Sequence, residues 1–177
     1  CFWDFAQIKG VKGSTAFAPG KTMRQTRYFP EARLSYAENL LFPAAEPDGP
    51  ALLLDGEGLA SSEMSWPELR ALTSRYQALF RRAGVEAGDR VAALVPNGAD
   101  AIAILLAANG LGAITATCSP DFGLEGAVDR FGQIAPKVFV SCEAYTYAGK
   151  RHDIGEKAAQ IAARLPGLVT HFSFDIF

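Results

Sequence analysis

Short apolar strands that alternate with helices are the feature of this sequence that most constrains its fold. Four stretches have strand character: Arg90–Val95, Ile114–Cys118, Lys137–Ser141 and Leu168–Phe174. Three helical stretches lie between them: Ala99–Asn109, Leu124–Ile134 and Asp153–Leu165. Strands joined through helices run parallel, with right-handed crossovers, in a sheet whose two faces the helices cover. The sequence therefore predicts an α/β domain built on a parallel sheet flanked by helices.

A parallel sheet binds ligands beyond the carboxyl ends of its strands. The segments that follow the first three predicted strands are Pro96–Gly98, Cys118–Asp121 and Ser141–Glu143. We therefore expect any ligand site to be formed by these three segments.

The region before the sheet predicts an arm and a small hairpin. Residues 1–33 show no clean period and carry six basic against two acidic side chains, whereas the whole chain has a net charge of −2. Such an arm could bind polyanions, or it could dock on an acidic body. We expect a short helix at Ser35–Phe42, a linker at Pro43–Pro50, and a β-hairpin formed by Ala51–Leu54 and Leu59–Met64.

The next helix has a complete set of end signals. Ser65-Trp66-Pro67-Glu68 is a capping box with proline in the first turn. Gly84 fits the position that ends the helix. The apolar residues between them recur on one helical face: Leu69, Leu72, Tyr76, Leu79 and Phe80.

Several function classes are disfavoured. The three cysteines have no C-x-x-C spacing, so neither a disulfide framework nor a zinc site is indicated, and a reducing cytoplasm suits them. The longest apolar run, Ala101–Ala108, is too short to span a bilayer. We expect a cytoplasmic protein that binds neither nucleic acid nor membrane.

Two glycine patterns imitate nucleotide-binding motifs. Gly20-Lys21-Thr22 lacks the first glycine of a P-loop, which would be at Thr15, and no strand precedes it. Gly110-Leu111-Gly112 and Gly56-Glu57-Gly58 lack the third glycine and the strand–turn–helix order of a dinucleotide site. We therefore expect neither kind of site.

Isolated reactive residues are better interpreted as structural. Cys118 ends a strand, but nothing places His152 or His171 beside it, so a buried small side chain is the better interpretation. Neither histidine has a partner at metal-ligand spacing. Asp121 is expected to cap the helix that begins near Gly123.

Several segments together resemble the acyl-adenylate-forming CoA ligase superfamily. Ser65–Leu69, Ala83–Val85 and Gly88–Val91 resemble a pattern general to that superfamily. Other segments resemble its acetoacetyl-CoA synthetase branch: Arg27–Leu41, Cys118–Gly123, Asp129–Val138 and Tyr145–Lys150. The resemblance extends to about Lys150 and becomes looser beyond Pro166.

The resemblance implies a two-step reaction of cytosolic ketone-body metabolism. Acetoacetate would react with Mg²⁺-ATP to give acetoacetyl-AMP and pyrophosphate, and the CoA thiol would then displace AMP. The phosphate loop, the magnesium-binding motif and the other catalytic motifs of the superfamily have no counterpart in these 177 residues. The chain is therefore expected to be an N-terminal fragment that acts with the remainder of its polypeptide and is inactive alone. No catalytic or metal-binding residue is assigned, and the parallel sheet is expected to be incomplete.

The resemblance also implies a partial CoA site. The matched positions are Tyr147, Ala148, Gly149 and Lys150, with Arg151 as a weaker candidate. Lys150 keeps a basic residue that would meet the phosphates of CoA, whereas Tyr147 replaces an expected arginine. Thr117 and Cys118 would lie near the channel for the CoA arm. The alternative is that Lys150 and Arg151 form an ordinary solvated turn.

These expectations divide the chain into a leader at residues 1–42 and the first part of the ligase large domain at residues 43–177. Two other functions stay open. One is a ligase of the same superfamily for another short acid, such as acetate or propionate. The other is a non-catalytic module with this fold that binds CoA or a partner.

Overall fold

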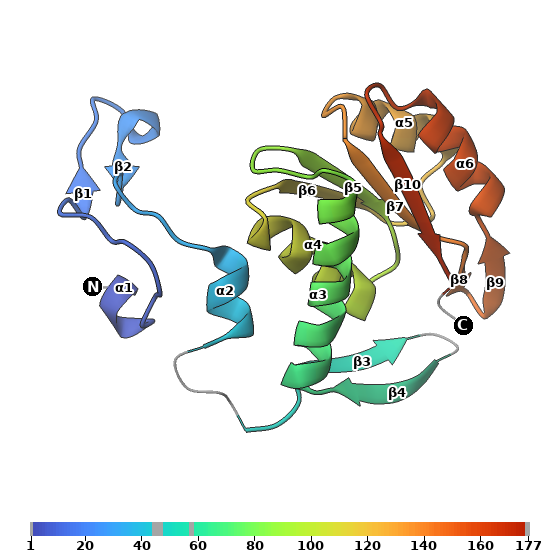
Figure 1. Cartoon of the computed structure of the whole chain (residues 1–177), viewed down its shortest axis with the longest axis horizontal. Coiled ribbons are helices and arrows are strands. Elements are labelled where there is room, and N and C mark those ends of the chain that lie inside the picture. Colours follow the sequence, from blue (N-terminus) through green and yellow to red (C-terminus); the bar gives the residue numbers. More distant parts are fainter. Residues whose placement is uncertain (1, 44–47, 57–58, 176–177) are drawn as a thin grey trace. The chain divides into compact units, whose positions relative to one another are not determined.

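The computed structural model describes residues 2–43, 48–56 and 59–175 and separates into two compact units, Cys1–Pro47 and Asp48–Phe177 (Figure 1). The predicted linker at Pro43–Pro50 lies partly outside the described residues.

The first unit contains short elements where the sequence predicted only an irregular arm. Strands β1 (Phe17–Ala18) and β2 (Arg27–Tyr28) pair antiparallel, and the rings of Phe17 and Tyr28 face each other at 5.4 Å. The remaining elements are α1 (Phe2–Phe5), the 3₁₀ turn η1 (Met23–Gln25) and α2 (Tyr36–Leu41). Helix α2 confirms the predicted short helix, and Ser35 caps it by accepting a hydrogen bond from the Glu38 N–H.

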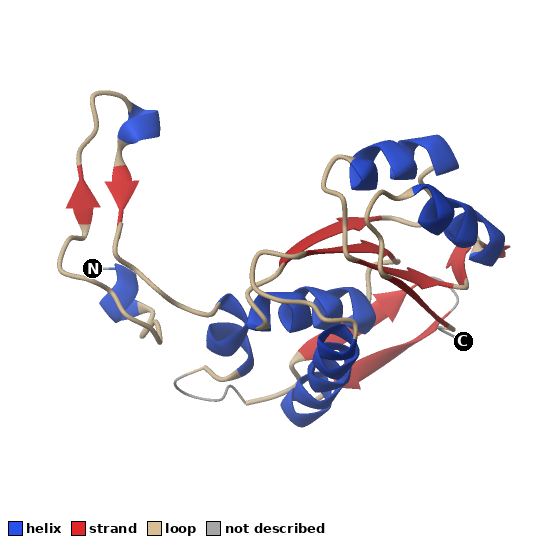
Figure 2. Ribbon diagram, turned by 45° about the horizontal axis from the view of Figure 1, so that its top comes forward, coloured by secondary structure: helices blue, strands red, loops and turns tan. Residues whose placement is uncertain are grey.

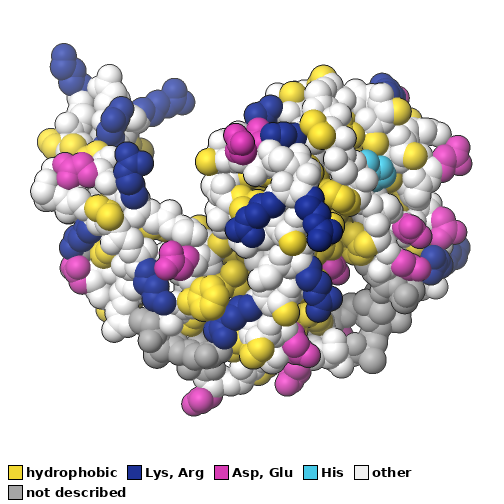
Figure 3. Space-filling model, viewed as in Figure 1, with side chains coloured by type: hydrophobic (Ala, Val, Ile, Leu, Met, Phe, Trp, Pro, Cys, Tyr) yellow, Lys and Arg dark blue, Asp and Glu magenta, His cyan; other side chains and the backbone are white. Residues whose placement is uncertain are grey.

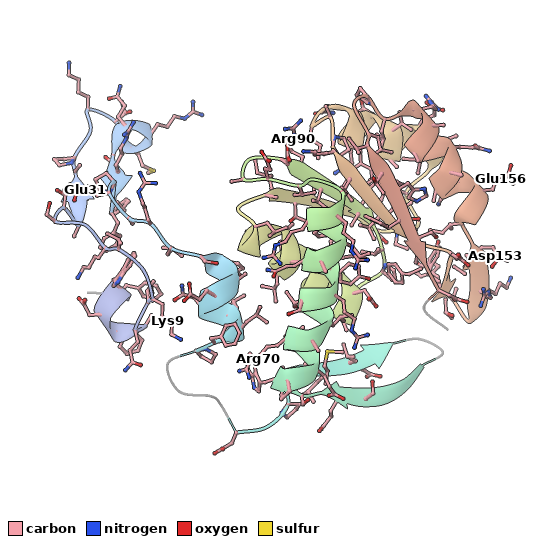
Figure 4. The ribbon with its side chains drawn as sticks, viewed as in Figure 1. Lys9, Glu31, Arg70, Arg90, Asp153 and Glu156 are labelled. Atoms are coloured by element: carbon pink, nitrogen blue, oxygen red, sulfur yellow. The ribbon has the colours of Figure 1, made fainter. Side chains whose placement is uncertain are left out.

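The carboxylate of Glu31 holds part of this unit together (Figure 4). It accepts hydrogen bonds from the Ser14 N–H at 2.7 Å and from the hydroxyls of Ser14 and Thr15. These bonds, chiefly the one from the Ser14 backbone, lower the pKa of Glu31. Gly20-Lys21-Thr22 follows the two-residue strand β1, although the sequence predicted no strand before it, and leads into the three-residue turn η1. It therefore has no α-helix that a phosphate loop would need after it.

The second unit begins with the predicted hairpin and helix. Strands β3 (Leu52–Gly56) and β4 (Leu59–Met64) pair antiparallel, and residues 57–58 of their turn lie outside the described residues. Helix α3 (Trp66–Arg82) starts with the predicted capping box. The chain leaves it through Gly84, whose φ of +73° favours glycine.

The predicted parallel sheet is confirmed. It contains β5 (Arg90–Leu94), β6 (Ile114–Cys118), β7 (Val138–Cys142) and β10 (Thr170–Phe174), in the order β10-β7-β5-β6. All three neighbouring pairs are parallel. The helices that complete the layers are α4 (Ala99–Gly110), α5 (Leu124–Gly132) and α6 (Gly155–Arg164).

Helices cover both faces of the sheet (Figure 2), and an apolar cluster lies on each face. One buried cluster joins α3 and α4 to the sheet through Phe80, Ile104 and Val140. The other joins α5 and α6 to the opposite face through Phe131, Phe139 and Ile161. Burial on both faces accounts for the continuous apolar character of β5 and β7.

A second hairpin was not predicted. Strands β8 (Ala144–Tyr147) and β9 (Lys150–Asp153) pair antiparallel between β7 and α6. The predicted start of the last helix at Asp153 is therefore wrong, because Asp153 ends β9 and pairs with Ala144.

Arg90 links β5 to the turn that follows α5 (Figure 4). Its guanidinium donates to the carbonyls of Ile134 and Ala135, each at 2.8 Å. This link lies at the amino end of β5, so the opposite, carboxyl end of the sheet is the end available for a site.

Candidate functional site

A hollow of about 230 Å³ lies at the carboxyl end of the sheet. Three segments and Ala101 line it: Val95–Asn97 after β5, Thr117–Asp121 at the end of β6, and Tyr145–Tyr147 of β8. This is the location expected for a ligand site in a parallel sheet. Two of the three segments are those predicted from the strand order, and the third belongs to the unpredicted hairpin.

The inner wall of the hollow is fixed by strand pairing. Leu94 and Cys118 are register partners, and the Val95 N–H donates to the Cys118 carbonyl at 3.2 Å. Cys118 is only 8% exposed, and burial raises the pKa of its thiol. A protonated, buried thiol is a poor nucleophile, so Cys118 is a wall residue, as the sequence predicted.

The outer wall is the β8–β9 hairpin. Its two-residue turn, Ala148-Gly149, has φ values of +51° and +68°, which are typical of a type I′ turn. Tyr147 is the register partner of Lys150. Tyr145 is the register partner of His152, and the two rings stack with their centroids 5.2 Å apart. Directly opposed residues share a face of an antiparallel pair, so Tyr147 and Lys150 share one face of the hairpin.

The structure brings together some of the predicted CoA residues and separates others. Tyr147, 62% exposed, lines the hollow with Thr117 and Cys118. Ala148, Gly149, Lys150 and Arg151 do not line it. Arg151 neighbours Lys150 on the strand, so it points to the opposite face, where it pairs with Asp153 at 3.1 Å.

The side chain of Lys150 is exposed at the tip of the hairpin. Within the described part of the chain, no carboxylate forms an ion pair with it. An unpaired ammonium at the rim of a hollow can meet a phosphate group. The geometry is therefore compatible with a phosphorylated ligand that passes the rim.

The expected helix cap at Asp121 is wrong. Helix α5 is capped by Gly123 without a side-chain hydrogen bond, and Asp121 is exposed. The Phe122 N–H bonds to the Ser119 carbonyl, which closes a turn before the helix begins. The negative charge of Asp121 instead favours the charged form of Lys157. Burial raises the pKa of Tyr145, and the charge of Asp121 raises it further.

Sequence reasoning missed Lys157. Its ammonium donates to the carbonyls of Pro120 at 2.6 Å and Phe122 at 3.1 Å. A single lysine on an amphipathic helix is usually solvated, so the position of Lys157 in the sequence did not indicate this contact.

A second, larger hollow of about 400 Å³ lies between the β3–β4 hairpin and the loop that follows β5. Its lining includes Leu53, Leu54, Ile102 and Phe174 together with Asp100. Asp100 accepts a hydrogen bond from the Tyr76 hydroxyl at 2.7 Å, which joins α4 to α3. Burial and this carboxylate raise the pKa of Tyr76. The Asp100 carboxylate in this hollow is therefore bound to the Tyr76 hydroxyl of the neighbouring helix.

The histidines take structural positions, as predicted. His152 stacks on Tyr145, and its Nε2 lies 3.3 Å from the Tyr147 carbonyl oxygen. His171 stacks on Phe139 at 4.9 Å, and its Nε2 lies 2.9 Å from the Ser141 hydroxyl. Among the described residues, no group of three or more metal-ligating side chains comes together. The described helices also include none that is long and apolar enough to cross a membrane.

Comparison with known proteins gives a consistent result. Residues 42–172 match the model of a family described as AMP-binding enzyme. The chain is 46% identical, over 98% of its length, to acetoacetyl-coenzyme A synthetase of Rhizobium meliloti (strain 1021) and covers 27% of that protein. It is 38% identical to malonamoyl-CoA synthetase of Penicillium aethiopicum, over 94% of the chain and 24% of that protein.

The fold comparison agrees. The structure of acetoacetyl-CoA synthetase from Streptomyces lividans matches 98% of the chain with a TM-score of 0.88 and 32% identity. The chain covers 29% of that structure. It thus spans about a quarter of the length of the curated relatives that it matches.

Proposed function

Since the chain belongs to the AMP-binding enzyme family, we propose that it is part of an acid–CoA ligase that forms acetoacetyl-CoA from acetoacetate, ATP and CoA. The observation that carries this proposal is the 46% identity to an acetoacetyl-coenzyme A synthetase over 98% of the chain. The reaction would proceed through acetoacetyl-AMP, with Mg²⁺ supporting the ATP step. Adenylation gives the carboxylate a good leaving group, so the CoA thiol can then displace AMP.

The proposed role of this chain is to form part of the wall that faces CoA. Its hollow is lined by Thr117, Cys118 and Tyr147, and the exposed Lys150 is the register partner of Tyr147. The narrow, mixed lining suits the slender CoA arm, and Lys150 would meet a phosphate. Arg151 would play a smaller part, because it lies on the other face and pairs with Asp153.

The acid itself is proposed as acetoacetate, and the malonamoyl-CoA synthetase relative suggests one specific alternative. Malonamate carries an amide where acetoacetate carries a methyl ketone, so the two acids have nearly the same shape. Comparing the two acids as substrates of the complete ligase would separate these possibilities. A preference for malonamate would replace acetoacetate in this proposal.

The test of the CoA wall is Lys150→Glu in the complete ligase. Reversing the charge should repel the phosphates of CoA and raise the KM for CoA at least tenfold. Acetoacetate-dependent ATP–pyrophosphate exchange, which needs no CoA, should stay within twofold of the wild type.

The matched control is Arg75→Glu, which reverses an exposed charge on α3, away from the hollow. This control should leave the KM for CoA unchanged. An unchanged KM in Lys150→Glu, or an equal rise in both variants, would identify Lys150 as an ordinary solvated residue.

A further inference from the structure

Two of the segments that line the hollow come from different parts of the fold and face it as separate walls. The loop between β6 and α5 supplies one wall through Ser119, Pro120 and Asp121. Strand β8 supplies the other. The sheet does not pair these two segments with each other, so the width of the hollow depends on what joins them.

Lys157 makes that junction. Its ammonium lies 2.6 Å from the Pro120 carbonyl oxygen and 3.1 Å from the Phe122 carbonyl oxygen. Pro120 is fully buried, so the loop end of the junction is anchored. Hydrogen bonds from a charged donor are stronger than neutral ones, and two of them converge here.

The other end of the junction moves with the hairpin. Lys157 lies in the first turn of α6, which begins at Gly155, directly after β9. The Ile154 N–H donates to the Glu143 carbonyl at 2.8 Å, which fixes the start of α6 to the start of β8. Lys157 therefore connects the loop wall to the element that carries the hairpin wall.

The position of Lys157 is unfavourable for the helix itself. A cation in the first turn opposes the helix dipole. Partial burial also lowers the pKa of Lys157, although the charge of Asp121 counteracts this effect. Neither the stability of α6 nor the solvation of the ammonium favours a lysine at this position. The two hydrogen bonds to the loop carbonyls do favour it.

We propose that Lys157 is a positioning residue that holds the two walls of the hollow at the separation needed by the CoA arm. The structural half of this inference is that Lys157 holds the two walls together, and it does not depend on the proposed ligase activity. The functional half is that the resulting separation suits the CoA arm, and it rests on that proposed activity. Lys157 would act without touching CoA.

The same helix offers a matched control. Arg164, near the other end of α6, pairs with Glu125 of α5 at 2.6 Å. Both side chains are well exposed, and neither lines the hollow. Removing Arg164 therefore tests whether any loss of contact between α6 and the α5 region has the same effect.

The structural test uses the complete polypeptide and does not depend on activity. Lys157→Met keeps the aliphatic stem and removes the donors, which frees the loop beside Cys118. Loss of two hydrogen bonds from a charged donor should make opening at least tenfold more frequent. Alkylation of Cys118 by iodoacetamide, followed by peptide mass spectrometry, should accelerate at least tenfold.

Two further variants keep this test decisive. Lys157→Arg retains donors for both carbonyls and should be alkylated at Cys118 within threefold of the wild-type rate. Arg164→Met should also keep the wild-type rate. A wild-type rate in Lys157→Met, or an equal acceleration in Lys157→Arg or Arg164→Met, would overturn the proposal.

The functional test uses the complete ligase. Lys157→Met should raise the KM for CoA about tenfold without changing the KM for ATP in pyrophosphate exchange, and Lys157→Arg should restore most of the affinity. An unchanged KM for CoA would contradict the positioning role. Absence of exchange in the wild type would contradict the proposed function instead, while the alkylation result would still decide the structural half.

Discussion

His171 is a half-buried side chain that should make stability depend on pH. It lies half-buried on β10 between the ring of Phe139 and the hydroxyl of Ser141. Burial lowers the pKa of this imidazole below its usual value of 6.5. The unfolded chain therefore binds the proton more readily than the folded chain.

The sign of the pH effect follows from this difference. Above about pH 6.5 His171 is neutral in both states, and its contribution to stability is fully present. As the pH falls below 6.5 towards the lowered pKa, protonation favours the unfolded state. The free energy of unfolding should therefore decrease across this interval in urea titrations.

The variant His171→Phe should remove the part of the slope that belongs to this residue and keep the ring contact with Phe139. His152→Asn retains His171 and should retain its share of the slope. If His171→Phe shows the same slope below pH 6.5 as the wild type, the assignment to His171 is wrong.

The turn Ala148-Gly149 carries a prediction at the scale of an element. Ala148 has a φ of +51°, a region that asparagine adopts more readily than alanine, and Asn-Gly is the preferred pair for a type I′ turn. Ala148→Asn should therefore stabilise the β8–β9 hairpin by about 1 kcal/mol. Exchange of the strand amides, measured by NMR, should slow about fivefold.

The β-branched variant Ala148→Val provides the opposite change, because valine is strained at positive φ. It should accelerate the same exchange. Faster exchange in the asparagine variant would show that the turn does not limit the opening of the hairpin.

Element by element, the sequence predicted most of the second unit. Strong periodicity and end signals located α3, and alternation with helices located the four parallel strands. Hairpin β8–β9 was not predicted because its strands are four residues long and mix aromatic, polar and charged side chains without a clear period. Asp121 was expected to cap α5 because capping was judged from residue type, whereas the turn that Phe122 closes on Ser119 places Gly123 at the cap.

The candidate site was predictable in location and only partly in composition. The carboxyl ends of β5 and β6 follow from strand order, which is why Cys118 and Pro96 were expected near a ligand. The contacts of Lys157 span 37 and 35 residues, and no local pattern encodes them. The CoA assignment of residues 147–151 came from resemblance and stays a prediction.

The whole chain corresponds to one part of a larger kind of enzyme. Residues 42–172 match the AMP-binding enzyme family, and the chain spans about a quarter of its curated relatives. These facts agree with the absence of the superfamily's phosphate loop and acidic magnesium-binding motif from the 177 residues. We therefore expect residues 1–177 alone to be inactive in the proposed reaction.

Acetoacetate-dependent ATP–pyrophosphate exchange distinguishes a complete acid–CoA ligase from an inactive part of one. It should be measured in parallel for residues 1–177 and for the complete polypeptide, with a reaction lacking acetoacetate as the blank. We expect exchange above the blank for the complete polypeptide and none for residues 1–177. Exchange by residues 1–177 alone, or none by the folded complete polypeptide, would contradict this expectation.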